Sequence, residues 1–423
     1  MDAQHEQDGS EEVFVFDRHH QIREGLYHPD LTRKHDDRTF EEGNARADIL
    51  SMLHGDEHRQ RRRLENPLFR RDALVNYERD LFPAVLNDVL ATQDQHEVDL
   101  FPLAGALAVV LAARRAGIDH GGTMAELLTL WDHVLMIAQA SAILDVIGDR
   151  DQVMRDVCDA LRVVDRDHVA PSRERRECTA SAAMPDDLIG RIIGNRRDAT
   201  GLADGIDDGV LVREAGLYLH GGSHTSAQTT CSTFFNLLGL EGMGGAHPAL
   251  ERVAADPLWA QAAVHETLRL RPTTPKLQRR ALAPMVLDGV AIPAGASVVF
   301  DVRAANRDPE LFGDDPDTFD PERRLAPGVA LWGLSFGAGP HICIGRSVAG
   351  GFPIQDGDLR SGVGESHLFG LVALIVRAIA ACGPEVIASD PPALDQRTNR
   401  GTRWERFPLA LARTPAGVVA HER

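Results

Sequence analysis

Phe336-Gly-Ala-Gly-Pro-His-Ile-Cys-Ile-Gly345 is the most informative stretch of this 423-residue chain. It is typical of a glycine-rich turn, and it holds one cysteine, Cys343. Backbone N–H groups of such a turn can point at the sulfur, which stabilises a thiolate and lowers the pKa of the thiol. A thiolate held in this way is suited to be an axial metal ligand. The alternative is a tight turn around a buried structural cysteine, and this is our interpretation of the other four: Cys158, Cys178, Cys231 and Cys382.

Three further patterns precede this turn. Glu266-Thr-Leu-Arg269 lies in a segment of helical spacing, Asp256–Arg271, where residues three apart share a face and can pair. Phe319-Asp-Pro-Glu-Arg323 lies in an irregular segment rich in Asp and Pro. Between them, Ile292-Pro-Ala-Gly is followed by Ala305-Asn-Arg-Asp-Pro-Glu-Leu-Phe312.

Together these four patterns resemble the cytochrome P450 family, and four in the right order are far more specific than one motif. F-G-x-G-x-H-x-C-x-G is the family's haem-binding signature, and every defining position from Phe336 to Gly345 is filled. The resemblance implies haem b as cofactor with Cys343 as the axial ligand of its iron, and thiolate ligation favours O–O cleavage. It also implies a structural contact among three charged residues: Glu266, Arg269 and Arg323. The resemblance covers roughly residues 11–412 and is weakest between 75 and 205.

The resemblance also implies how the haem is held. His54-Gly-Asp-Glu-His58-Arg-Gln-Arg-Arg62 resembles the family helix on which a His and an Arg four residues apart bind the propionates. By the same resemblance the cofactor-binding residues are His58, Arg62, Arg279, Phe336, His341, Cys343 and Gly345. Two buried carboxylates need charge-assisted partners of this kind. The alternative for His58 and Arg62 is a solvated basic helix face.

A basic run around this helix stands out in an acidic protein, and it consists of Arg59, Arg61, Arg62, Arg63, Arg70 and Arg71. The resemblance implies that the helix lies on the proximal face, where an acidic ferredoxin docks. Complementary charge there mainly raises the rate of encounter. An ordinary solvated helix is the alternative.

The long helical segment Ile206–Leu240 departs from the family pattern at Gly221-Gly222-Ser223-His224-Thr225-Ser226, where A-G-x-(D/E)-T-(T/S) is expected. The resemblance implies that glycines open the helix over the iron and that a hydroxyl orders water, with catalytic positions at Gly221, Gly222, His224 and Thr225. His224 replaces the acid that usually relays protons, and histidine can relay protons near neutral pH. Three alternatives stay open. The substrate supplies a carboxylate near His224 or Arg400, peroxide drives turnover, or His224 points away into a helix contact.

Composition and charge exclude several classes of protein. Lys and Arg number 45 against 63 Asp and Glu, and the net charge of −18 argues against a nucleic-acid binder. No apolar run reaches the ~18 residues of a membrane span, and the polar, acidic N-terminus is the reverse of a signal peptide. The cysteines lack the C-x-x-C spacing of zinc sites. We therefore expect a soluble, cytoplasmic protein with neither a membrane nor a nucleic acid as partner.

Helical spacing dominates the chain, and short strand patterns are concentrated in its C-terminal half. This predicts a mainly α fold with a minor β region, in a single domain spanning residues 1–423. The resemblance implies a P450 fold that is N-terminally shortened, because few residues precede His58. We expect the charged segment Val164–Asp187 to be an exposed connection. We also expect the insertion Gly351–Glu365 to stop the final helix early, because its start is rich in Gly and Pro.

The resemblance implies a haem-thiolate oxidoreductase, a P450 monooxygenase or oxidase, that uses O2 and electrons from a separate ferredoxin and ferredoxin reductase. The segment before His54 is brief, which implies a short roof and an open pocket for a bulky substrate. A secondary metabolite of peptide type fits best, with hydroxylation, coupling or oxidative decarboxylation, as in bottromycin-type pathways, as the reaction. The alternatives are a peroxide-driven peroxygenase of the same fold and a non-catalytic haem-containing protein that docks a carrier domain.

Overall fold

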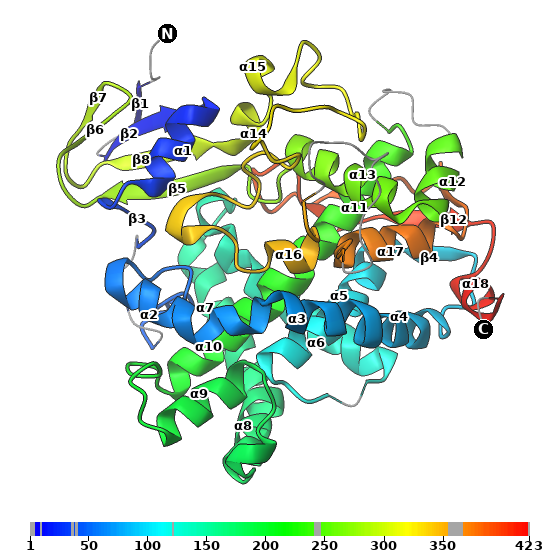
Figure 1. Cartoon of the computed structure of the whole chain (residues 1–423), viewed down its shortest axis with the longest axis horizontal. Helices are drawn as coiled ribbons and strands as arrows, with labels where there is room; N and C mark the ends of the chain where they lie inside the picture. Colours follow the sequence, from blue (N-terminus) through cyan, green and yellow to red (C-terminus); the bar gives the residue numbers. More distant parts are fainter. Residues whose placement is uncertain are drawn as a thin grey trace.

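The computed structural model describes residues 5–8, 11–34, 38, 41–120, 122–240, 247–353 and 367–421. It is 53% helix and 11% strand, which confirms the predicted mainly α fold with a minor β region. Most helices lie together in one part of the molecule, and the strands of the largest sheet lie at one side of them (Figure 1). No helix among these residues is long and apolar enough to cross a membrane. The single domain stays a prediction.

The helices are α1 His19–Tyr27, α2 Gly55–Glu65, α3 Arg71–Asn76, α4 Phe82–Leu90, α5 Leu100–Ala116, α6 Met124–Ser141, α7 Arg150–Val164, α8 Ala170–Glu177, α9 Leu188–Arg197, α10 Asp208–Leu219, α11 Thr225–Leu237, α12 His247–Ala255, α13 Pro257–Leu270, α14 Val302–Ala305, α15 Pro309–Phe312, α16 Arg346–Ala349, α17 Leu371–Ala380 and α18 Pro415–His421. Three π-helical turns interrupt them: η2 Tyr77–Leu81, η4 Asp165–Val169 and η6 His220–His224. The strands are β1 His5–Asp8, β2 Glu11–Phe16, β3 Leu31–Thr32, β4 Glu97–Asp99, β5 Lys276–Ala281, β6 Met285–Leu287, β7 Val290–Ile292, β8 Ser297–Asp301, β9 Pro384–Val386, β10 Ala393–Leu394, β11 Trp404–Arg406 and β12 Pro408–Leu411.

The largest sheet joins the N-terminus to the C-terminal half of the chain. Its strand order is β1-β2-β8-β5-β3, and β2 runs parallel to β8 with Phe14 opposite Val298 and Phe16 opposite Phe300. These four side chains are buried in one apolar cluster, because alternate residues of a strand face the same side of the sheet. The sheet therefore fixes β5, which carries Arg279, against the start of the chain.

Helix α5 is the centre of the helical part. Its sequence is apolar on all sides, which is typical of a buried helix, and α6, α10, α11 and η6 pack against it. Asp99 caps its N-terminus by accepting a hydrogen bond from Phe101 N at 3.1 Å. Gly105 allows Trp131 of α6 to approach closely, since a Cβ there would lie 2.4 Å from the indole ring.

The predicted long helix is present as α10, η6 and α11, and it is not uniform. Two adjacent glycines, Gly221 and Gly222, lie inside the π turn η6. Because glycine is a weak helix former, this pair lowers the stability of the helix at that point. Hydroxyls on the following residues accompany this turn: Thr225 Oγ1 donates to Gly221 O and Ser226 Oγ to Gly222 O, both at 2.8 Å. π turns occur frequently at functional sites, so the middle of this helix is a candidate part of such a site.

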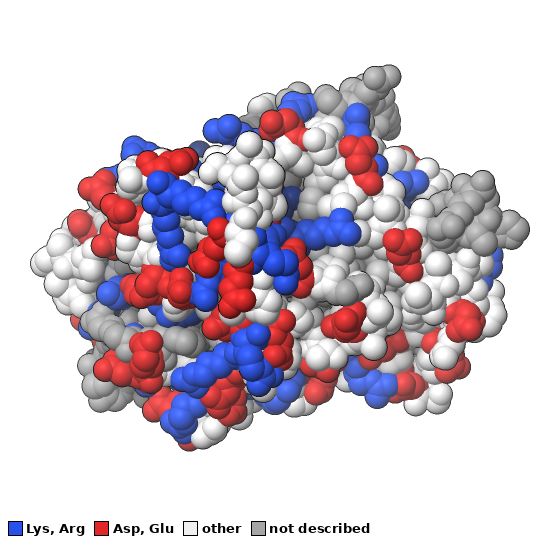
Figure 2. Space-filling view, turned by 90° about the horizontal axis from the view of Figure 1, so that it is seen from below, with Lys and Arg blue, Asp and Glu red and all other residues white. Residues whose placement is uncertain are grey.

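The prediction of an exposed connection at Val164–Asp187 is partly right, because many of its residues are exposed but much of the segment is helical. Its first half continues as η4 and α8, and Arg176 is buried with its Nη2 2.7 Å from Asp187 and its Nη1 3.3 Å from Asp119. Charged side chains of both signs are interleaved on the face that carries this region (Figure 2). The sequence suggested exposure because it is charged, but those charges pair with partners far from them in the chain.

The predicted early end of the final helix is confirmed. α16 ends at Ala349, and among the described residues the next helix is α17, which begins at Leu371. Residues 354–366 of the insertion lie outside the described residues. Both of its ends are held together at the base, where Phe352 N donates to Leu368 O at 2.8 Å. Gln261 of α13 braces this base by donating to Gly350 O at 2.9 Å.

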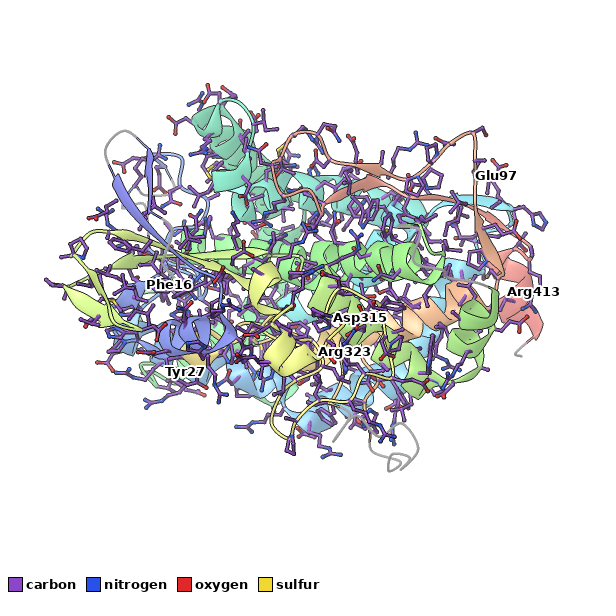
Figure 3. The ribbon with its side chains drawn as sticks, turned by 90° about the horizontal axis from the view of Figure 1, so that it is seen from above. Phe16, Tyr27, Glu97, Asp315, Arg323 and Arg413 are labelled. Carbon is purple, nitrogen blue, oxygen red and sulfur yellow. The ribbon has the colours of Figure 1, made fainter. Side chains whose placement is uncertain are left out.

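A buried ion triad ties α13 to the irregular segment that precedes the cysteine turn. Arg269 Nε and Nη2 donate to the two carboxylate oxygens of Glu266, each at 2.7 Å, and Arg323 Nε donates to Glu266 Oε1 at 3.1 Å. Arg269 and Glu266 are 0% and 1% exposed, so both charges depend on each other and on the backbone for solvation. Figure 3 shows Arg323 close to Asp315, whose carbonyl its guanidinium also contacts at 3.1 Å.

Replacing Glu266 by Gln should therefore be strongly destabilising. Two buried guanidinium groups would lose their only shared anion, and breaking one side of a buried pair costs about 3–5 kcal/mol. We expect the free energy of unfolding, measured by guanidinium denaturation, to fall by that amount in Glu266→Gln. The matched control is Glu251→Gln on the exposed face of α12, which should unfold like the unmodified protein. Equal stability of the two variants would contradict the role given to the triad.

Candidate active site

A cavity of about 360 Å³ lies between the cysteine turn and the long helix. Its floor comes from the cysteine turn, including Phe336, His341, Cys343 and Gly345. Its other walls come from α2, α5, β5 and the long helix, and the long helix contributes Leu217, Tyr218, His220, Gly221, Gly222, Thr225, Ser226 and Thr229. The cavity thus brings together three motifs that lie far apart in the sequence.

The cysteine turn folds tightly around its sulfur. Cys343 N donates to Phe336 O at 2.8 Å, which closes the loop. Gly339 has φ +67°, and a Cβ there would lie 2.4 Å from Leu26 O, so this position of the turn requires glycine. The Cys343 side chain is exposed, and because it lines the cavity, the thiol opens into it.

The pKa of the Cys343 thiol differs from the prediction made from the sequence. Desolvation raises it above the usual value, and the Gly345 N–H, Arg346 and Arg62 offset that effect only in part. The predicted backbone N–H is therefore present, but desolvation by the surrounding cavity wall has the larger effect on the pKa of the thiol. A coordinating metal ion deprotonates such a thiol outright, so the loop is built for a ligand and not for a free thiolate.

A group of basic side chains, arginines and histidines, lies beside the cysteine. It consists of Arg33, His58, Arg62, Arg279 and His341, here called the propionate-side group. The imidazole rings of His58 and His341 are 4.0 Å apart, and Arg62 Nη1 donates to Ile342 O at 3.3 Å. The four members predicted from the sequence are thus brought together, and Arg33 joins them.

These groups shift each other's pKa in the direction expected for crowded positive charge. Desolvation, followed by the charge of Arg62, lowers the pKa of His58 to about 4. Desolvation and then His58 lower the pKa of His341 to about 2. Desolvation and then Arg33 lower the pKa of Arg279 to about 9. Like charges gathered in a desolvated site favour the uncharged forms.

The site fits the haem that the resemblance implies. Among the described residues that line the cavity there is no Asp or Glu, so the propionate-side group has no carboxylate in the wall to balance it. Two propionates would supply that balance through charge-assisted hydrogen bonds, and the Cys343 thiol is available to the iron. The apolar remainder of the wall, including Ala108, Leu111, Leu268 and Val372, suits a porphyrin ring.

Arg33 is a site residue that sequence reasoning missed. It directly follows β3, whose Thr32 pairs with Arg280 of β5, the neighbour of Arg279. That pairing across the sheet brings Arg33 to the propionate-side group, and desolvation lowers its pKa there. Nothing local in the sequence around Arg33 signals this position, because it depends on a strand pairing between distant segments.

Gly221, Gly222 and Thr225 all line the cavity, as predicted, but the two glycines differ. A Cβ on Gly221 would meet nothing within 4 Å, so this glycine leaves open space. A Cβ on Gly222 would lie 3.0 Å from Ala112 Cβ, so this glycine permits close packing on α5. The pair therefore serves both the cavity and the core.

His224 is not part of the cavity wall. It is 5% exposed, its ring stacks on Trp131 with centroids 6.2 Å apart, and it meets Phe101 edge-on at 6.1 Å. Desolvation, followed by the charge of Arg403, lowers its pKa well below the usual value. This position corresponds to the alternative in which His224 points into a helix contact.

His220 lines the cavity instead, and the sequence reading missed it. It is five residues before Thr225, and five residues is the hydrogen-bond repeat of a π turn. The sequence predicted a regular α-helix, in which residues five apart do not lie on the same side. The adjacent glycines Gly221 and Gly222 were the one sequence feature that indicated an irregular turn.

The basic run splits into buried and exposed parts. Arg61 is buried and pairs with Glu214 of α10, so it is structural. Arg62 belongs to the propionate-side group. Arg59, Arg63, Arg70 and Arg71 are exposed, and only such residues can take part in docking a partner.

Comparisons with known proteins agree with this geometry. A family model described as Cytochrome P450 matches residues 257–350. The cyclooctat-9-en-7-ol 5-monooxygenase of Streptomyces melanosporofaciens is 30% identical over 374 residues, spanning 76% of this chain and 75% of the relative. The erythromycin C-12 hydroxylase of Saccharopolyspora erythraea is 29% identical over 317 residues, spanning 74% and 72%.

Solved structures share the fold. A mutant of P450 EryK in complex with erythromycin B superposes with a TM-score of 0.69 at 22% identity, covering 95% of this chain and 92% of that one. CalO2 superposes with a TM-score of 0.71 at 22% identity, covering 97% and 92%. The family model matches the region of the cysteine loop, and the relatives match about three quarters of the chain. This chain therefore belongs to the cytochrome P450 family and is a haem-dependent P450 enzyme.

Proposed function

We propose that this P450 oxidises a bulky secondary metabolite, specifically a peptide-type intermediate, with O2 and with electrons from a ferredoxin and its reductase. The cavity carries the proposal. The Cys343 thiol opens into it, the propionate-side group lies beside that thiol, and Gly221 and Thr225 line the same space. Hydroxylation is the simplest reaction of this arrangement, and coupling or oxidative decarboxylation are more specific forms of it.

When bound, haem supplies oxygen activation and one-electron redox chemistry at its iron. The chain's own residues would hold and orient it: Cys343 would supply a thiolate to the iron, and the propionate-side group would bind the carboxylates. The Thr225 hydroxyl, which donates to Gly221 O at 2.8 Å, is one of the proton-bearing groups that the long helix contributes to this wall, together with Tyr218, Ser226 and Thr229. We give His224 no role in proton delivery, because it lies outside the cavity wall.

The wall and the relatives both support a bulky substrate. The roof segment contributes apolar Ala45, Ile49 and Leu50 to the cavity, and α5 and α6 contribute Leu111 and Ile137. By their names, the relatives act on cyclooctat-9-en-7-ol and on erythromycin. A peptide-type intermediate adds polar groups that this partly cationic wall can bind.

Electron delivery from an acidic ferredoxin is supported by the exposed arginines on the α2–α3 side of the cysteine turn. Arg63 and Arg70 are exposed there, and Arg71 lies 4.7 Å over the ring of Phe352 at the base of the insertion. Complementary charge would steer encounter and raise the association rate.

Stopped-flow reduction under carbon monoxide tests the electron donor. With a plant-type ferredoxin, its reductase and NADPH, we expect haem reduction to depend on ferredoxin and to slow with added salt. The double variant Arg63→Gln/Arg70→Gln should be reduced about tenfold more slowly at low salt, while Arg155→Gln, exposed on α7, should match the unmodified enzyme. Haem reduction that does not depend on ferredoxin, together with substrate turnover on hydrogen peroxide alone, would favour the peroxygenase alternative and contradict the proposal.

Haem retention tests the propionate-side group. Arg33→Gln and Arg279→Gln each remove a charge-assisted partner, an interaction worth about 1.5–3 kcal/mol, so we expect haem transfer to apomyoglobin to be at least tenfold faster in each. Arg280→Gln is the matched control, because Arg280 is the exposed neighbour of Arg279 on β5. Unchanged haem loss in Arg33→Gln would show that this residue does not hold a propionate.

A further inference from the structure

We propose that Glu65, the last residue of α2, is held as an uncharged carboxylic acid and in that form positions the phenol of Tyr218 in the cavity wall. Tyr218 lines the cavity and Glu65 does not, so Glu65 is a positioning residue that acts through Tyr218. The inference goes beyond the proposed function, because it depends on neither the substrate nor the electron donor.

Glu65 belongs to a buried polar cluster where α2 meets α10. The cluster contains two carboxyl groups, those of Glu65 and Glu214, together with the guanidinium of Arg61 and the phenol of Tyr218. Both glutamates are 0% exposed. Bulk water therefore does not solvate their charged forms, and each carboxyl depends on neighbouring protein groups.

The hydrogen-bond partners of the two carboxyls differ. Glu214 Oε2 accepts hydrogen bonds from the guanidinium of Arg61 and, at 2.9 Å, from Leu50 N. Glu65 Oε2 lies 3.0 Å from Tyr218 Oη, which is an uncharged partner. Oε1 of each glutamate has no hydrogen-bond partner in the described structure. One guanidinium balances one carboxylate, so the cluster is neutral when Glu214 is ionised and Glu65 keeps its proton.

Electrostatics agree with a proton on Glu65. Desolvation and then the charge of Glu214 raise the pKa of Glu65 well above its usual value, and nearby arginines oppose that rise only in part. Desolvation also raises the pKa of Glu214, but there the next cause is the charge of Arg61, which lowers it. Of two carboxyls that share a site, the one with fewer charge-assisted partners keeps the proton.

The other charged groups near this pair are engaged elsewhere. Arg62 of α2 donates from Nη1 to Ile342 O at 3.3 Å, on the side of the cysteine turn. Arg213 of α10 donates from Nε to Ala47 O at 2.7 Å. Arg115 of α5, which acts on Tyr218, donates to Leu68 O. Among the described residues, none of these three arginines donates a hydrogen bond to Glu65.

An uncharged Glu65 changes what Tyr218 can do. A carboxylate only accepts a hydrogen bond from the phenol, whereas a carboxylic acid can donate its own proton to Tyr218 Oη. The phenol proton is then available to another acceptor. Tyr218 lines the cavity beside Phe69, whose ring centroid lies 5.9 Å from its own. The protonation state of Glu65 therefore sets the hydrogen-bonding role of Tyr218.

The cluster also connects three segments that form the site. α2 carries His58 and Arg62 of the propionate-side group, α10 continues into the π turn η6, and the roof residue Leu50 is held through Glu214. Loss of the Glu65 proton would place two carboxylates in one buried cluster, and their repulsion would act on all three segments. The cluster should therefore become less stable as the pH rises.

Infrared difference spectroscopy of the haem-loaded enzyme at pH 7 tests the protonation state. The difference between the unmodified enzyme and Glu65→Gln should contain the C=O stretching band of a protonated carboxylic acid. The matched control is Glu57→Gln, exposed on the same helix, whose difference should contain the bands of an ionised carboxylate instead. Carboxylate bands in the Glu65→Gln difference would overturn the inference.

The pH dependence of unfolding gives a second readout. A pKa that is higher in the folded state than in the unfolded state makes stability fall as pH rises between the two values. The unfolding constant of the haem-loaded enzyme, divided by that of Glu65→Gln, should rise about tenfold between pH 6 and pH 7. The corresponding ratio to Glu57→Gln should stay constant. A constant ratio to Glu65→Gln contradicts the proposal.

Ligand binding tests whether Glu65 acts through Tyr218, with 4-phenylimidazole as a probe that coordinates haem iron. Glu65→Leu and Tyr218→Phe should each bind it at least threefold more weakly. The double variant should bind no more weakly than the weaker single variant, because both substitutions remove the same contact. Glu65→Gln, which keeps an uncharged donor, should bind like the unmodified enzyme. Effects that multiply in the double variant overturn the positioning role.

Discussion

The buried contact of Glu266 with Arg269 and Arg323 is the interaction on which the rest of the architecture depends. It joins α13 to an irregular segment that offers few other regular contacts, with Arg269 also donating to Asn306 O at 2.8 Å and Pro316 O at 2.6 Å. The cysteine turn follows this segment directly. A single buried carboxylate thus fixes the path of the chain into the loop that carries the haem ligand, since removing one member of a buried ion pair is far more costly than an exposed one.

Positive charge is the second organising feature. Six arginines and three histidines line one cavity of this acidic protein, and no Asp or Glu lines it among the described residues. The propionate-side group beside Cys343 fits the two propionates of haem. Desolvation makes uncompensated charge costly there and so favours a bound anion.

The local motifs could be predicted from the sequence, and the long-range placements could not. The Cys343 turn and the Glu266 pair are short patterns in which the chemistry depends on neighbours in the chain. Arg33 reaches the site through a strand pairing with β5, and His220 reaches it through a π turn, neither of which a local pattern encodes. His224 was predicted on the wall by analogy with the family, but ring packing on Trp131 holds it in the core. Charge suggested exposure for Val164–Asp187, which holds for many of its residues, whereas Arg176 and Asp187 are buried as an ion pair.

The most direct test of this account is the carbon monoxide difference spectrum of the reduced, haem-loaded protein, recorded with Cys343→Ala and with Cys178→Ala as a control for an exposed cysteine elsewhere. Thiolate ligation by Cys343 predicts a strongly red-shifted Soret band in the unmodified protein and in Cys178→Ala, and its loss in Cys343→Ala. A band that is unchanged in Cys343→Ala, or a purified protein that binds no haem, would contradict the account.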